Sequence, residues 1–150
     1  MATFESADAL LDFAIAGEEE AVEFYTKLAE KAQGAARKAF EDFAKEEMGH
    51  KQKLLAIKAG RQLAPVEGRI TDLKIADYVV DVDEEGELDY RQALLIAMKK
   101  EKAAFKLYTA LGEAARDEGL RSLLLALAQE EAKHKLRFEI EYDENVLSEN

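Results

Sequence analysis

The pattern Glu-x-x-His occurs twice in the sequence and contains both histidines of the chain. Residues 45–51 read KEEMGHK, and residues 129–135 read QEEAKHK. Side chains three positions apart on a helix project from one face, so a glutamate and a histidine at this spacing can bind the same metal ion. Carboxylate and imidazole ligands with open positions favour iron or manganese, although zinc would also bind. The repeated pattern therefore indicates metal chemistry.

The inward faces of the predicted helices extend this pattern. Steps of three and four residues follow one face, and each such face is apolar except for a glutamate near its middle, with a histidine three positions later in two helices. The six residues are Glu18, Glu47, His50, Glu101, Glu131 and His134. An unpaired buried carboxylate is costly, but two divalent cations would balance four carboxylates beside two neutral imidazoles. We therefore predict a two-metal site; a bundle whose polar core residues satisfy one another is the alternative.

Four helices are predicted to carry these residues, from apolar periodicity and from end signals. Thr3 or Ser6 caps the first helix, Gln33-Gly34 stops it, and Asp89 caps the third. The helices are predicted to end at about Lys31, Ala59, Arg116 and Tyr142, and the second and fourth to begin at about Ala35 and Glu118.

Residues 61–88 differ in composition from these helices. They contain the only proline of the sequence and the acidic run DVDEEGE, with room for a short helix over residues 72–80. The joints between the first two and the last two helices are tight, so each pair should be antiparallel. The segment 61–88 can span a helix length at about 3.3 Å per residue. We therefore predict an all-α fold, a ferritin-like four-helix bundle with one long crossover between helices two and three.

The sequence also contains an internal repeat. Residues 18–29 match residues 101–112, and residues 44–54 match residues 128–138. The chain is therefore predicted to form two helix hairpins of common design, at about 5–60 and 89–142, around a pseudo-two-fold axis. Residues 1–150 are expected to form a single domain, as the length allows.

Composition excludes several classes of function. The formal net charge of −11 disfavours nucleic acid and anionic membranes as partners, because both require a basic surface. The sequence has no cysteine, which excludes disulfides, thiolate zinc sites and cysteine-bound iron within these residues. No signal-peptide pattern or membrane-spanning run is present, so a cytoplasmic location is expected.

The repeated segments resemble the rubrerythrin branch of the ferritin-like di-iron carboxylate proteins. The resemblance rests on EEEAVEFYTKLA and EKAAFKLYTALG, followed by AKEEMGHK and AQEEAKHK, and it covers most of the chain. It implies a site of two iron ions, with Glu18 and Glu101 as single carboxylate ligands and Glu47 and Glu131 as bridges. It also implies an oxidoreductase that reduces peroxide or dioxygen, with a role in oxidative stress.

Two departures from the family pattern have consequences. Rubrerythrins carry a rubredoxin domain with cysteine-bound iron, which these residues cannot form, so electrons are expected from a separate donor protein such as a rubredoxin. The family also has an extra glutamate one turn after the third-helix ligand, where this chain has Ala104. We therefore predict slower peroxide turnover than in full rubrerythrins, and an increase in the Ala104→Glu variant.

Other assignments are less specific. Tyr25 and Tyr108 are candidate catalytic residues that hydrogen-bond to the ligand carboxylates or relay electrons, and plain packing in the core is the alternative. Glu46 and Glu130 lie off the inward faces, as second neighbours of the metals or as solvated residues. A ferroxidase or other iron-handling role, and a helical interaction module with a vestigial site, are the alternative functions. A homodimer is expected.

Overall fold

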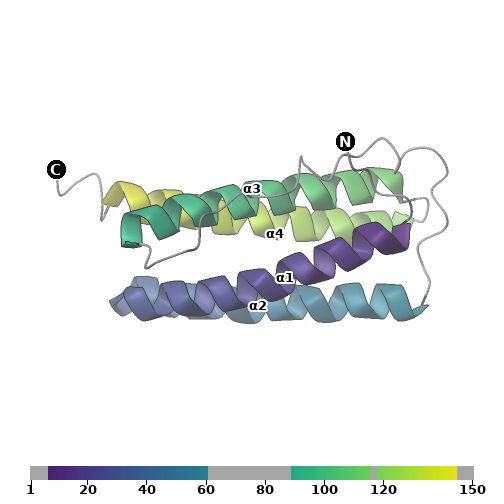
Figure 1. Cartoon of the computed structure of the whole chain (residues 1–150). Helices are drawn as coiled ribbons and strands as arrows, with labels where there is room; N and C mark the ends of the chain where they lie inside the picture. Colours follow the sequence, from purple (N-terminus) through teal and green to yellow (C-terminus); the bar gives the residue numbers. More distant parts are fainter. Residues whose placement is uncertain (1–6, 61–88, 116–117, 145–150) are drawn as a thin grey trace.

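The computed structural model describes residues 7–60, 89–115 and 118–144, which form four helices in one bundle (Figure 1). The helices are α1 (Ala7–Lys31), α2 (Gly34–Gly60), α3 (Tyr90–Ala114) and α4 (Glu118–Tyr142). The predicted all-α bundle is thus confirmed. The proposed caps at Thr3 and Ser6, the segment 61–88 and its short helix lie outside the described residues.

The helix ends follow from local chemistry. Gly34, the first residue of α2, has a φ of +59°, a left-handed conformation that glycine adopts without steric penalty and that turns the chain from α1 into α2. Asp89 caps α3 as predicted: its carboxylate accepts from the Gln92 N–H at 2.7 Å, and the Gln92 side chain accepts from the Asp89 N–H at 3.2 Å.

The predicted end of α3 at Arg116 was wrong by two residues. Ala115 already has an extended backbone, with φ −71° and ψ 134°. Arg121 of α4 satisfies the carbonyls left open there, since its guanidinium donates to Gly112 O and Ala115 O, each at 3.1 Å. A cation at a helix C-terminus is favourable for both hydrogen bonding and the helix dipole. This contact joins α3 to α4 at their turn.

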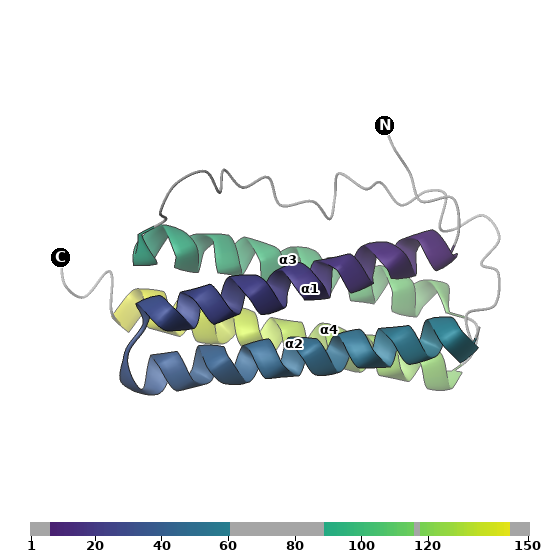
Figure 2. The same cartoon turned by 60° about the horizontal axis from the view of Figure 1, so that its bottom comes forward.

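The helices pair as two antiparallel hairpins. α1 packs mainly on α2 and α3 mainly on α4, and the two hairpins lie against each other (Figures 1 and 2). The C-terminal half of α1 shares one apolar cluster with the N-terminal half of α3, so these helices are also antiparallel. The repeat is therefore related by a pseudo-two-fold axis that crosses the bundle near its middle.

Two apolar clusters occupy the ends of the bundle. The first, which we call the aromatic end, includes Tyr25, Phe40 and Phe138, with Phe43 packed against them. The second, the leucine end, includes Leu11, Leu54, Leu111, Leu124 and Leu127. Between them lies a layer of buried polar residues. No helix within the described residues is long and apolar enough to cross a membrane.

Candidate metal centre

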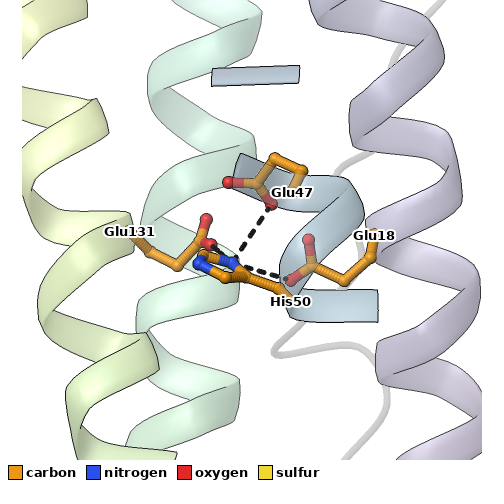
Figure 3. A group of neighbouring side chains, drawn as sticks. All are labelled: Glu18, Glu47, His50 and Glu131. Carbon is orange, nitrogen blue, oxygen red and sulfur yellow. Dashed lines mark ion pairs between the residues drawn. The ribbon is translucent and has the colours of Figure 1, made fainter. Parts of the chain in front are cut away.

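The central layer brings together all six predicted metal-ligating residues. They form two groups, and in each group one oxygen or nitrogen atom per residue lies within 4.8 Å of the others. One group is Glu18, Glu47, His50 and Glu131, and the other is Glu47, Glu101, Glu131 and His134 (Figure 3 shows the first). Glu47 and Glu131 belong to both groups, which is the position that bridging carboxylates require.

Each imidazole presents its Nδ1 atom to the carboxylates. His50 Nδ1 lies 2.8 Å from Glu131 Oε1, 3.7 Å from Glu18 Oε1 and 3.8 Å from Glu47 Oε2 (Figure 3). The second group repeats this arrangement, since His134 Nδ1 lies 2.9 Å from Glu47 Oε1 and 3.7 Å from Glu101 Oε1. Of these carboxylates, the central glutamate of the other hairpin therefore lies closest to each Nδ1 atom.

Burial makes these contacts informative. All six residues are at most 3% exposed, and each has one buried atom that makes no well-formed hydrogen bond with the described part of the chain, although His50 Nδ1 lies 2.8 Å from Glu131 Oε1 and His134 Nδ1 lies 2.9 Å from Glu47 Oε1. These atoms are Glu18 Oε2, Glu47 Oε1, His50 Nδ1, Glu101 Oε2, Glu131 Oε1 and His134 Nδ1. Buried polar atoms in native proteins are nearly always satisfied. One such atom on every predicted ligand fits a pair of divalent cations.

The other nitrogen of each ring is held by a carboxylate from the opposite hairpin. Glu130 contacts Nε2 of His50, and Glu46 contacts Nε2 of His134. A metal-ligating histidine usually donates its second N–H to a carboxylate, which orients the ring. Glu46 and Glu130 thus contact predicted metal ligands, and their side chains are also 56% and 45% exposed, so both predicted descriptions apply to them. The two adjacent glutamates in each repeated segment, at 46–47 and 130–131, are the feature of the sequence from which this contact could have been predicted.

Tyr25 and Tyr108 also connect the hairpins. The Tyr25 hydroxyl donates to Glu101 Oε1, and the Tyr108 hydroxyl donates to Glu18 Oε1. Both tyrosines are at most 1% exposed. Burial, followed by the charge of the nearby carboxylates, raises the pKa of both hydroxyls well above 10. They remain hydrogen-bond donors across the physiological range.

Without metal, the centre holds protons tightly. Burial raises the pKa of Glu18 to about 8 and moves that of Glu131 well above its usual value. Burial alone would lower the pKa of His50, but interactions with the carboxylates of Glu18 and Glu47 outweigh it and raise the pKa to about 9. The carboxylates of Glu101 and Glu47 likewise outweigh burial at His134 and raise its pKa to about 11. Metal binding must displace these protons.

A cavity of about 420 Å³ opens between α1 and α3 and reaches the centre. Ligand carboxylates and both tyrosines form its inner part, and small residues that include Gly17, Ala21 and Ala104 form its walls. This cavity was not predicted from the sequence, although Ala104 was noted as a departure from the family pattern. The alanine and glycine residues close to Glu18 and Glu101 are the feature of the sequence from which it could have been predicted.

Comparison with known proteins agrees with this arrangement. A sequence model of the rubrerythrin family matches residues 9–89 and 92–150. A protein from Thermotoga maritima, described as a ferritin-like diiron-carboxylate protein, shares the fold with a TM-score of 0.81 and 21% identity over 97% of this chain and 100% of that chain. A hypothetical protein from Pyrococcus furiosus has a TM-score of 0.69 and 27% identity over 89% of this chain and 86% of that chain.

Among curated proteins, no sequence matches the chain. The family match nevertheless spans all four helices, and the two pairs of Glu-x-x-His residues meet in the buried layer that a di-iron carboxylate site requires. The chain belongs to the rubrerythrin family and has its ferritin-like fold.

Proposed function

We propose that this protein is an oxidoreductase that binds two iron ions in the central layer and reduces peroxide or dioxygen. The observation that carries the proposal is the convergence of six buried residues into two overlapping groups, in each of which one oxygen or nitrogen atom per residue lies within 4.8 Å of the others. Two divalent cations with two neutral imidazoles would neutralise the four carboxylates. Glu47 and Glu131 would bridge the ions, with Glu18 and His50 on one side and Glu101 and His134 on the other.

Two iron ions held by these six residues would supply the redox chemistry that reduces the oxidant. The residues of the chain do the remaining work. Glu130 and Glu46 orient the imidazoles through their Nε2 atoms, so that Nδ1 faces the cations. Tyr25 and Tyr108 hold one oxygen each of Glu101 and Glu18, which fixes the direction of the other oxygen.

The proposed reaction also requires a path for the oxidant and a source of electrons for the iron. The cavity between α1 and α3 lets a small oxidant reach the carboxylates from outside. The sequence lacks cysteine and therefore has no thiolate iron of its own to carry electrons. A separate donor protein, such as a rubredoxin, would restore the reduced iron. We also propose that the protein acts in the cytoplasm as a homodimer.

Adjacent glutamates offer a matched test. Glu18 is 3% exposed in the central layer, whereas Glu19 is exposed and pairs with Lys51 at 3.0 Å. After anaerobic loading with ferrous iron, peroxide consumption and iron oxidation are followed with an artificial reductant present. We expect catalytic peroxide consumption in the wild type and in Glu19→Gln, and loss of both bound iron and activity in Glu18→Gln.

The alternatives predict other results. A ferroxidase or iron-handling protein would take up more than two iron ions per chain and oxidise them without repeated peroxide turnover. An interaction module with a vestigial site would bind no iron when iron is supplied. Equal activity in Glu18→Gln and Glu19→Gln would contradict the assignment of the central layer as the reaction site.

A further inference from the structure

The cavity beside the central layer is much larger than a small oxidant needs. Its volume is about 420 Å³, whereas a water molecule occupies about 30 Å³ of the liquid and hydrogen peroxide is only slightly larger. Cavities of about 300–1,000 Å³ are typical of sites that bind organic molecules. Two metal ions at the carboxylates would occupy part of this volume, and a site serving only peroxide or dioxygen would not require the rest.

The walls of the cavity are mostly apolar. α1 contributes Phe13, Ala14 and Ala21, and α3 contributes Ala103, Ala104 and Leu107. Four carboxylates, those of Glu18, Glu47, Glu101 and Glu131, meet at the floor, and two further charged residues, Glu20 and Lys100, also line the cavity. Apolar walls with a few convergent polar groups fit a molecule that has an apolar body and one reactive polar end.

Small residues on α1 and α3 create the space. Ala21 and Ala104 are repeat-related positions, each three residues after a predicted ligand, and both are only partly buried. Gly17 lies next to Glu18, and a Cβ atom added there would meet no heavy atom within 4 Å. The cavity therefore begins directly above the ligand carboxylates and continues outward.

We propose that this cavity binds organic hydroperoxides, with the apolar body between α1 and α3 and the O–O group at the carboxylate floor. This inference rests on the proposed function and specifies its substrate class. Reduction breaks the O–O bond, consumes two electrons and two protons, and releases an alcohol and water. The electrons come from the reduced metal pair, which the separate donor protein reduces again.

Binding is tested without redox chemistry, using the full chain loaded with zinc and the alcohol 2-phenyl-2-propanol, the product of cumene hydroperoxide. Isothermal titration and alanine-methyl NMR report its binding. We expect saturable binding that shifts the methyl signals of Ala21 and Ala104, and not that of Ala126 on the exposed face of α4.

Two exposed helix glycines provide a variant and its control. Gly17 lines the cavity, whereas Gly49 does not, and a Cβ at either position meets open space. Gly17→Leu should weaken alcohol binding about tenfold or more, as expected when a pocket is filled, and Gly49→Leu should leave it unchanged. Ala104→Leu is a second variant that should weaken binding.

Activity of the iron-loaded protein separates this inference from the proposed function. We expect Gly17→Leu to lower kcat/KM for cumene hydroperoxide at least about fivefold more than kcat/KM for hydrogen peroxide, which needs less of the cavity, and Gly49→Leu to leave both values unchanged. Reduction of hydrogen peroxide alone, or alcohol binding insensitive to both cavity variants, would overturn the organic substrate only. If neither peroxide is reduced, the proposed function fails and the substrate assignment fails with it.

Discussion

The central layer and the two ends of the bundle obey different constraints. In the layer, every repeat-related pair is identical: Glu18 and Glu101, Glu47 and Glu131, His50 and His134. At the ends, some repeat-related pairs of α1 and α3 are also identical, such as Leu11 and Leu94, but three pairs of α2 and α4 diverge between phenylalanine and leucine, with the phenylalanine at the aromatic end. The diverged pairs are Phe40 with Leu124, Phe43 with Leu127, and Phe138 with Leu54.

The difference follows from what each region must do. A metal site needs particular atoms at particular places, whereas an apolar core needs only matched volume and shape. Changes in the central layer should therefore remove metal, and changes at the ends should lower stability while leaving the metal content intact.

Removal of metal should have the largest effect. Binding of two ions, each at about a thousand times its Kd, would stabilise the fold by about 8 kcal/mol in total. We therefore expect chelation to lower the Tm by more than about 15 °C. Differential scanning calorimetry of the loaded and chelated chain measures this shift. Equal Tm values would contradict charge balance in the layer without contradicting the fold.

The metal-free chain should lose stability as pH rises. Folding raises the pKa of Glu18 from 4.5 to about 8 and that of His50 from 6.5 to about 9. A group with a raised folded-state pKa stabilises the fold fully below its unfolded value, and this stability is lost as pH rises through the folded value. We expect the Tm of the chelated chain to fall between about pH 5 and about pH 9. A Tm that rises over this window would contradict the prediction.

Truncation at the ends should affect stability alone. Phe138 and Leu54 are both 0% exposed, and Phe138 packs on the rings of Tyr25, Phe40 and Phe43 at 5.2–5.5 Å. We expect Phe138→Ala to lower the free energy of unfolding by about 4 kcal/mol and Leu54→Ala by about 3 kcal/mol. Denaturant unfolding checks the values. Both variants should keep two metals per chain. Loss of a metal in either variant would contradict the expectation that changes at the ends leave the metal content intact.

Removal of an orienting carboxylate should weaken metal binding more moderately. Glu130 is partly exposed but contacts Nε2 of His50, a ring that is 2% exposed. We expect Glu130→Ala to reduce metal affinity about 10–100-fold, because the ring loses its fixed orientation. Metal titration against a competing chelator measures the change. Another glutamate, the exposed Glu41, provides a control, and the Glu41→Ala variant should bind metal as the wild type does.

The smallest predicted effect lies where an end meets the layer. The Phe43 ring stacks on His134 with centroids 4.1 Å apart, and the repeat places Leu127 at the corresponding position near His50. Such a ring contact contributes about 1 kcal/mol. We therefore expect the two metals to differ in affinity by about fivefold, and Phe43→Leu to make them more alike. Stepwise metal titration of Phe43→Leu should show that the two affinities become more similar. An unchanged difference would show that the Phe43–His134 contact does not cause it.

The sequence alone determined the four helices and the identity of the six residues in the layer. Helix periodicity places residues 18, 47, 50, 101, 131 and 134 on inward faces, and a buried carboxylate must be paired or neutralised, so the composition of the layer follows from local rules. The cap at Asp89 and the break at Gly34 were predictable for the same reason, because they depend on neighbouring backbone atoms.

Tertiary structure alone decided which groups meet across the hairpins. Glu130 contacts the histidine of the other hairpin, Tyr25 bonds to Glu101, and Arg121 ends α3. Each contact depends on how one helix is rotated and shifted against another, which periodicity along a single helix does not specify. The cavity has the same origin, because an alanine such as Ala104 creates space only where the facing helix also presents small residues.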